Sequence, residues 1–150
     1  MEQINLARNL SLQILHTRSA FRKAMIRMFR ANGIDLTFEM LQVMYPLWQK
    51  DGVTQQQIAD AACKDKGSMV SIIDNLVKRG LVERCPDPKD RRNNLICLTE
   101  KGRQLGEKAY PLVLAQYYPW NESISDDDLK QCIATLQRAE IIMKTIYNQQ

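Results

Sequence analysis

Asp90, Arg91 and Arg92 are the residues in this sequence whose types and spacing most clearly suggest chemistry. They close a loop, residues 86–92, that also contains Lys89 and is too charged to pack into a core. A guanidinium group presents a planar fork of donors that matches phosphate oxygens, so we expect the arginines to face an anion. We expect Asp90 to brace Arg92 through a charge-assisted hydrogen bond. Duplex DNA is the first candidate for the anion.

Two short apolar runs flank this loop. Residues 81–85 follow Gly80, and residues 95–98 form the second run. Both have the length and composition of strands, so the sequence predicts a two-stranded hairpin with the basic loop at its tip. Thr99 is expected to start a helix directly after the hairpin.

Two predicted helices precede the hairpin. Thr54 and Gln57 fit a capping box, in which each side chain satisfies the other's backbone donor at the start of a short helix. Asp65 can cap the next helix, residues 66–79, which Gly80 stops. Two helices joined by a tight turn and followed by a hairpin predict a winged helix-turn-helix. In that motif the second helix enters the major groove of DNA by its N-terminal end.

Hydroxyl and ammonium groups on the front of the helix at 66–79 could meet base edges and phosphates. The alternative is an ordinary polar helix face exposed to water. Candidates at the start of the preceding helix and at the end of helix 66–79 are expected to touch phosphate rather than bases. The predicted DNA-binding residues are Thr54, Gln55, Lys64, Lys66, Ser68, Ser71, Lys78, Lys89, Asp90, Arg91 and Arg92.

The helices outside this region have predictable ends and weak points. Thr37 can cap a helix in which Pro46 removes a hydrogen bond, so we expect a kink or an early end there. The helix after Thr99 is expected to bend near Pro111 and to be interrupted by the polar stretch 119–123. Ser125, followed by three aspartates, is expected to cap the last helix.

The first and last parts of the chain contain long amphipathic segments. They have more apolar residues than one small lobe can cover, which predicts a homodimer held by these segments. The predicted fold is mainly α with a small β-hairpin wing, a single unit over residues 1–150. Within it, residues 4–32 and 103–148 are the dimerisation helices, and residues 37–102 are the DNA-binding lobe with its winged helix-turn-helix.

Length and composition set limits on function. At 150 residues and 45% hydrophobic, the chain can bury one core. The balance of 21 Lys and Arg against 17 Asp and Glu is only mildly basic, but many of the cations lie between residues 64 and 101, which favours a directed polyanion-binding face. No apolar run approaches the roughly 20 residues that span a bilayer, and no signal-peptide pattern is present. We therefore expect a cytoplasmic protein with no membrane partner.

Groups for catalysis or cofactor binding are scarce. The chain has one histidine, His16, no Gly-rich phosphate loop and no nucleophile beside a base in a recognisable context. Its cysteines include no Cys-x-x-Cys pair, which argues against a zinc site or a disulfide framework. We expect no enzyme, no metal and no cofactor. Whether the cysteines are small apolar side chains or a redox switch stays open; they are Cys63, Cys85, Cys97 and Cys132.

These motifs resemble the MarR (multiple-antibiotic-resistance regulator) family of bacterial transcription factors, over almost the whole length. The resemblance implies an obligate homodimer held by the first and last helices, bound to a near-palindromic operator and usually released by a small ligand or by oxidation. The motifs are similar to the family's first motif helix, recognition-helix exit and wing: Thr54-Gln55-x-x-Ile58-Ala59, Asp74-x-Leu76-x-x-x-Gly80-Leu81-Val82-x-Arg84, and Asp90-x-Arg92 with Ile96-x-Leu98-Thr99-x-x-Gly102.

The chain departs from the family pattern in two places. Val70-Ser71 stands in the recognition helix where the family commonly has Thr or Ser followed by Arg, so the operator sequence cannot be borrowed from relatives. The first long helix has no cysteine, which does not support the chemistry of the peroxide-sensing branch. That leaves the operator and any effector to be found for this chain itself.

A cleft between the DNA-binding lobe and the dimerisation helices is implied by the same resemblance. An apolar or aromatic effector could enter there, although Met and aromatic residues at helical spacing are usually core. The candidate ligand-binding residues are His16, Met40, Met44, Tyr45, Trp48 and Tyr110.

The function expected from the sequence is a sequence-specific regulator of transcription that binds double-stranded DNA. We expect a repressor that acts as a homodimer on a near-palindromic operator, and a small aromatic or amphipathic ligand is the hypothesis for its release. The alternatives are a winged-helix module that binds protein or RNA, and a regulator that responds to oxidation through its cysteines.

Overall fold

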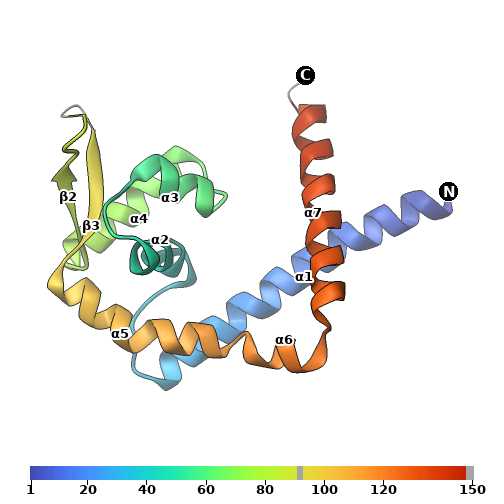
Figure 1. The fold of residues 1–150 in the computed structure, drawn as a ribbon, viewed down its shortest axis with the longest axis horizontal. Helices are drawn as coiled ribbons and strands as arrows, with labels where there is room; N and C mark the ends of the chain where they lie inside the picture. Colours follow the sequence, from blue (N-terminus) through green and yellow to red (C-terminus); the bar gives the residue numbers. More distant parts are fainter. Residues whose placement is uncertain (91–92, 148–150) are drawn as a thin grey trace. The chain divides into compact units, whose positions relative to one another are not determined.

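The computed structural model describes residues 1–90 and 93–147 of the chain. It divides into two compact units, Met1–Val113 and Leu114–Gln150, which are described separately. Most of the helices and all of the sheet belong to the first unit (Figure 1). Its elements are α1 (Glu2–Ala31), α2 (Phe38–Gln49), β1 (Val53–Thr54), α3 (Gln55–Ala61), α4 (Lys66–Lys78), β2 (Val82–Pro86), β3 (Asn94–Leu98) and most of α5 (Glu100–Ala115).

The second unit consists of two helices after the end of α5. α6 (Tyr118–Ser123) occupies the stretch where the sequence predicts an interruption, and Pro119 lies in its first turn, where the missing backbone N–H has no helical partner to lose. α7 (Asp126–Tyr147) begins as predicted, because the Ser125 hydroxyl oxygen accepts a hydrogen bond from the backbone N–H of Asp128 at 3.2 Å. The interruption of the helical chain is therefore a break between helices rather than a coil.

Pro46 does not end α2, and the expectation of an early end there is wrong. Thr37 caps the helix as predicted, with its hydroxyl oxygen accepting from the N–H of Met40 at 3.1 Å. Beyond the proline, Leu47 is fully buried and the Trp48 indole N–H donates to the carbonyl of Gly102 at 3.3 Å. These contacts stabilise the last turn enough to offset the one backbone hydrogen bond that proline removes.

The sheet has three antiparallel strands in the order β1-β3-β2, one more than the predicted hairpin. In the hairpin, Val82 pairs with Leu98 and Pro86 pairs with Asn94. The third strand, β1, is only two residues long, and Val53 pairs with Ile96. A strand this short shows no periodicity along the sequence. The predicted fold, mainly helical with a small winged sheet, is otherwise confirmed.

The core of the first unit lies between the C-terminal part of α1, helices α2 to α5 and the inner face of the sheet. Met25 and Phe29 are the fully buried residues of α1, and Met44, Ile73 and Ile96 are equally buried in α2, α4 and β3. The N-terminal half of α1 adds no buried residue to this core. The winged lobe, residues 37–102, therefore holds most of the core that keeps the recognition elements in place.

Two glycines allow the wing to join this core. Gly80 ends α4 with a positive φ of 67°, a conformation that favours glycine. Gly102, in the first turn of α5, lies so close to the start of the wing that an added Cβ would stand 2.0 Å from the carbonyl oxygen of Leu81. Only glycine lets α5 and the entrance to β2 approach this closely.

Within the described residues, no helix combines the length and the apolar character needed to cross a membrane.

Candidate nucleic-acid interface

The start of α4 is organised by Asp65. Its Oδ1 accepts from the backbone N–H of Ser68 at 2.8 Å, and its Oδ2 accepts from the Ser68 hydroxyl at 2.7 Å. These two hydrogen bonds lower the pKa of Asp65 below its ordinary value, because both favour the ionised carboxylate. The predicted cap at Asp65 is confirmed. The structure also shows that the Ser68 hydroxyl is part of this cap.

The two faces of α4 differ sharply. Met69, Ile73 and Leu76 are fully buried, whereas Ser68 and Ser71 are exposed to solvent. The Ser71 hydroxyl donates to the Ser68 carbonyl at 3.0 Å. Both serine oxygens keep acceptor lone pairs that an approaching base or water could use. The predicted recognition face is therefore polar and open to solvent, but its hydroxyl protons are engaged within the helix.

The predicted lysines do not all gather at this end of the helix. Lys64 is half-buried just before the cap, and the Lys66 side chain lies outside the described part of the chain. Lys78 is exposed twelve residues further on, which corresponds to about 18 Å along a helix. The structure therefore separates Lys78 from the N-terminal end of α4, where the other candidates lie.

A second polar surface forms where α3 meets the base of the wing. The capping box at Thr54 is confirmed, with Thr54 N–H donating to Gln57 Oε1 at 2.9 Å and Gln57 N–H donating to Thr54 Oγ1 at 3.2 Å. Because β1 pairs with β3, this helix start lies beside the first residues of β3. A polar cavity of about 370 Å³ opens there, lined by Thr54, Gln55, Gln56, Asn93 and Asn94.

The sequence analysis misses Asn93 and Asn94 as members of this surface. Their amides belong to the strand side of the wing, and only the β1–β3 pairing brings them to Thr54 and Gln55. The only signal in the sequence is the β-branched pair Val53-Thr54 directly before the capping box.

The wing loop is described up to Asp90. The backbone N–H of Lys89 donates to Asp87 Oδ1 at 2.8 Å, and the backbone N–H of Asn93 donates to the carbonyl of Asp90 at 2.9 Å. The Asn93 side-chain amide donates to Asp90 Oδ2 at 3.3 Å. Arg91 and Arg92 lie outside the described residues, so the bracing of Arg92 by Asp90 stays a prediction.

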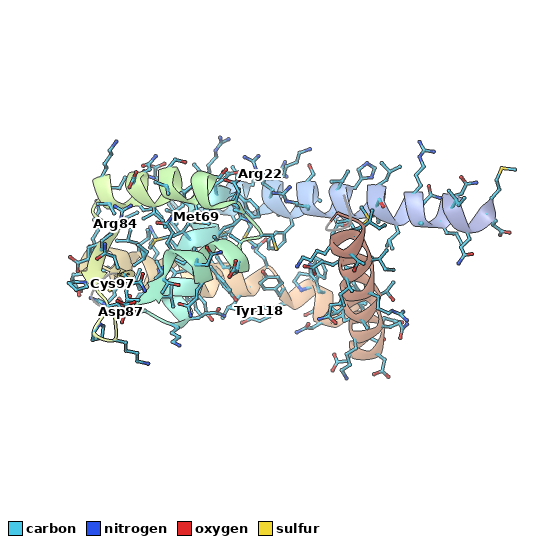
Figure 2. All side chains as sticks on the ribbon, turned by 90° about the horizontal axis from the view of Figure 1, so that it is seen from above. Arg22, Met69, Arg84, Asp87, Cys97 and Tyr118 are labelled. Carbon is cyan, nitrogen blue, oxygen red and sulfur yellow. The ribbon has the colours of Figure 1, made fainter. Side chains whose placement is uncertain are left out.

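Ion pairs and hydrogen bonds tie the wing to the helices around it. Arg84 on β2 binds Asp74 on α4 with a 2.6 Å contact between Nη2 and Oδ1. On the other edge, Asp51 Oδ1 accepts from the backbone N–H of Leu98 at 2.8 Å, and its Oδ2 accepts from Arg103 at 2.6 Å. Arg84 and Asp87 lie together in the wing in Figure 2. The recognition helix, the wing and the start of α5 are thus bound to one another by charged side chains.

The candidate ligand residues separate into three groups. Tyr45 and Tyr110 stack with ring centroids 5.5 Å apart, and Trp48 meets Tyr110 edge to face at 6.5 Å. Met40 and Met44 are buried core residues, whereas His16 is exposed on α1. A cavity of about 320 Å³ is present beside the aromatic group, lined by Trp48, Leu98, Arg103, Gly106, Glu107 and Tyr110. The structure thus brings two of the six predicted residues to one cavity.

The cysteines also fall into two classes. Cys63 and Cys132 are exposed, and Cys85 and Cys97 are half-buried in the wing. Burial, the neighbouring Cys85 thiol and the carboxylates of Asp51 and Glu83 raise the pKa of Cys97 to about 12. Within residues 1–90 and 93–147, no three His, Cys, Asp or Glu side chains are close enough together to hold a metal ion.

Comparison with known proteins gives one consistent family. Residues 36–93 match the model of the MarR family. The chain is 28% identical over 141 residues to YkoM, an uncharacterised HTH-type transcriptional regulator of Bacillus subtilis (strain 168), covering 93% of this chain and 90% of that protein.

Solved structures agree over most of the chain. CouR from Rhodococcus jostii RHA1, crystallised with p-coumaroyl-CoA, has a TM-score of 0.76 and 31% identity, covering 88% of this chain and 92% of that one. A MarR-family transcriptional regulator from Rhodococcus sp. RHA1 has a TM-score of 0.69 and 30% identity with the same coverage. Regulators of this family are not enzymes, as the sequence predicts. The capped and exposed α4, the wing bound to it and these likenesses lead to one conclusion: the chain belongs to the MarR family of winged helix-turn-helix, DNA-binding transcriptional regulators.

Proposed function

We propose that this regulator is a homodimeric repressor that binds a near-palindromic operator and is released by a small aromatic or amphipathic ligand. In each half-site, the N-terminal end of α4 enters the major groove and the wing loop follows the adjacent minor groove. The observation that supports this most is the contrast between the two faces of α4, because the helix presents exposed Ser68 and Ser71 opposite a fully buried apolar face.

Exposed apolar residues on the terminal helices support the homodimer. On α1, Ile4 is 72% exposed and Leu15 is 60% exposed, and on α7 Ile141 and Met143 are similarly open. A soluble chain rarely leaves this much apolar surface in water, and a second copy of the chain is the partner that covers both helices symmetrically. A two-fold dimer presents two copies of α4 to DNA, which is why a near-palindrome is the expected target.

The aromatic cavity supports release by a ligand. Trp48 and Tyr110 form its apolar wall, and its volume of about 320 Å³ suits a single aromatic ring with a short substituent. CouR was crystallised with p-coumaroyl-CoA, which contains such a ring. The cavity also includes Arg103, the residue bound to Asp51 at the edge of the wing. A ligand that moves Arg103 would act on the wing without touching α4.

Binding to a specific DNA site is the first test. The probe is a near-palindrome from the region upstream of the protein's own coding sequence, compared with a scrambled duplex of the same length. Ser71→Glu should abolish specific binding, because its carboxylate would face the phosphate-lined groove, while the fold and the dimer stay intact. Ser123→Glu adds the same charge on α6 and should bind normally. Unchanged binding by Ser71→Glu would show that another element enters the groove.

Two further measurements separate the alternatives. An RNA duplex of the same sequence should bind more weakly than the DNA, and tighter binding to RNA would favour the RNA-binding alternative. A reporter placed behind the operator should be more active when the regulator is deleted, because a bound repressor blocks transcription. A less active reporter in the deletion strain would make the protein an activator.

A panel of aromatic acids, phenols and quinones tests the ligand. Trp48 lines the cavity, so binding should change its fluorescence in a Trp120→Phe background, where no other tryptophan contributes. The same compound should weaken operator binding. If no compound changes the fluorescence or the melting temperature, the ligand part of the proposal fails and the DNA-binding part stands.

A further inference from the structure

Two of the cysteines occupy neighbouring strands of the wing. Cys85 is on β2 opposite Leu95, and Cys97 is on β3 opposite Glu83. The two positions are therefore diagonal neighbours, offset by two residues in the register. Because side chains alternate along a strand with a period of two, both thiols lie on the same face of the hairpin, opposite the face that carries buried Val82, Ile96 and Leu98.

We propose that Cys85 and Cys97 are a redox-active dithiol that closes into an intramolecular disulfide within the wing. Both side chains are half-buried, so a small oxidant can reach them while a bulky protein thiol is hindered. Cys63 and Cys132 are exposed but lie on other elements, outside the wing. The pairing is thus specified by the strand register rather than by exposure.

The environment of the pair assigns the two thiols different roles. Cys97 keeps its proton at neutral pH, because its pKa of about 12 reflects burial and the surrounding negative groups. The attacking thiolate therefore comes from Cys85. With an organic hydroperoxide as the oxidant, the Cys85 sulfur attacks the terminal peroxide oxygen. The O–O bond breaks, an alcohol leaves with a proton from water, and a sulfenic acid forms on Cys85.

Cys97 then resolves the sulfenic acid. Its sulfur attacks the Cys85 sulfur, the S–S bond forms as the S–O bond breaks, and the departing hydroxide takes the Cys97 proton to become water. The two thiols together give up two electrons, which reduce the hydroperoxide to the alcohol and water. No residue outside the pair is consumed.

Strand geometry predicts what the disulfide does to the wing. Diagonal partners in an antiparallel pair are about 7–8 Å apart, whereas a disulfide needs Cα atoms about 4.4–6.8 Å apart. Closure must therefore draw β2 and β3 together at one diagonal and increase their twist, which displaces the loop between them. The same strain makes the bond easy to reduce, which suits a reversible modification. The effect on DNA rests on the proposed role of the wing; the formation of the disulfide does not.

The experiment uses the full-length reduced protein treated with cumene hydroperoxide. Peptide mapping without reduction should find one bridge, Cys85–Cys97, and thiol titration should fall from four groups to two. Operator affinity should fall by about tenfold, the loss expected when the wing gives up one good contact, and should recover after treatment with dithiothreitol.

Matched variants keep the result falsifiable. The Cys63→Ser/Cys132→Ser double variant should form the bridge and lose affinity as the wild type does, and Cys85→Ser and Cys97→Ser should do neither. Circular dichroism checks that the two wing variants fold. A bridge through Cys63 or Cys132, or a sulfonic acid on Cys85 beside an unchanged Cys97 thiol, would overturn the proposal. A mapped bridge with unchanged operator affinity would overturn its regulatory part.

Failure of the proposed function would look different. A reduced wild-type protein that does not bind the operator contradicts the DNA-binding proposal, and peptide mapping still decides whether Cys85 and Cys97 form the bridge.

Discussion

In the winged lobe, residues 37–102, Met44, Ile58 and Ile73 are completely buried, whereas Ile4 on α1 and Ile142 on α7 expose more than half of their surface. The lobe is held together by its own apolar core. The outer parts of the terminal helices bury little within the chain and depend on a partner for their apolar residues. The comparison separates two sources of stability, one internal to the chain and one that depends on association, and each can be removed without the other.

Truncation of a core residue should give the largest effect. Ile73→Ala removes buried methyl groups from α4 and leaves a cavity, which should lower the free energy of unfolding by about 2–5 kcal/mol. Ile142→Ala, the matched change on an exposed position, should cost far less under conditions where the chain is monomeric. Urea denaturation of both variants measures the difference. Equal losses would mean that α7 is as well buried as the lobe.

A charge on the exposed face of α7 should separate association from folding. Ile142→Glu would place a carboxylate in the expected dimer interface, so light scattering should fall from twice the chain mass towards the chain mass. The core of the lobe should be unaffected by circular dichroism. Gln137→Glu adds the same charge at an exposed polar position and should remain dimeric. A wild-type protein that is a stable monomer and still binds the operator tightly would contradict the dimer itself.

The wing loop provides the next largest effect. Arg92→Ala should weaken specific binding by about 1–3 kcal/mol if the guanidinium contacts base edges, and should lower the salt dependence by about one unit if it mainly neutralises phosphate. Asp90→Ala is the matched test, because removing an acid near DNA should strengthen binding unless that acid positions Arg92. In the second case the losses in the double variant should fail to add. Tighter binding by Asp90→Ala together with wild-type binding by Arg92→Ala would show that the wing loop makes no specific contact.

The cap of α4 should give the smallest effect, visible as a pH dependence. The pKa of Asp65 is lowered in the folded protein, so its ionisation stabilises the fold fully above its ordinary value of 3.8 and loses that contribution as the pH falls through the lower folded value. Asp65→Asn keeps an acceptor at the cap but cannot titrate. The difference in unfolding free energy between wild type and variant, measured by denaturation, should therefore shrink in acid. A difference that is constant with pH would contradict the role of the charge.

Local signals in the sequence predict much of this molecule. The caps at Thr37, Thr54, Asp65 and Ser125 are found from residue type and spacing, because each cap is completed within three residues of itself. The hairpin strands are likewise visible as short apolar runs between turn residues. Features that close over a few residues leave their mark in the order of the chain.

What escapes prediction depends on contacts between distant residues. β1 exists because Val53 meets Ile96, and α2 continues past Pro46 because Trp48 reaches Gly102. The role of Asp51 is equally hidden, since an aspartate followed by glycine appears to be only a turn in the sequence. For the interface, the predicted hydroxyls of Ser68 and Thr54 turn out to be used in caps, because the same short polar side chains suit both tasks.

The hydrogen bond from the Leu98 N–H to Asp51 joins residues 47 positions apart, and the loop it closes contains α3, α4 and the hairpin. Opening of this one link releases both ends of that loop together, so the segment should behave as a single cooperative unit in amide hydrogen exchange. The Leu98 amide and the buried amides of α4 should then exchange at the same free energy of opening, whereas the N-terminal turns of α1 exchange by local fraying. The recognition helix and the wing would be gained or lost in one step as the chain folds.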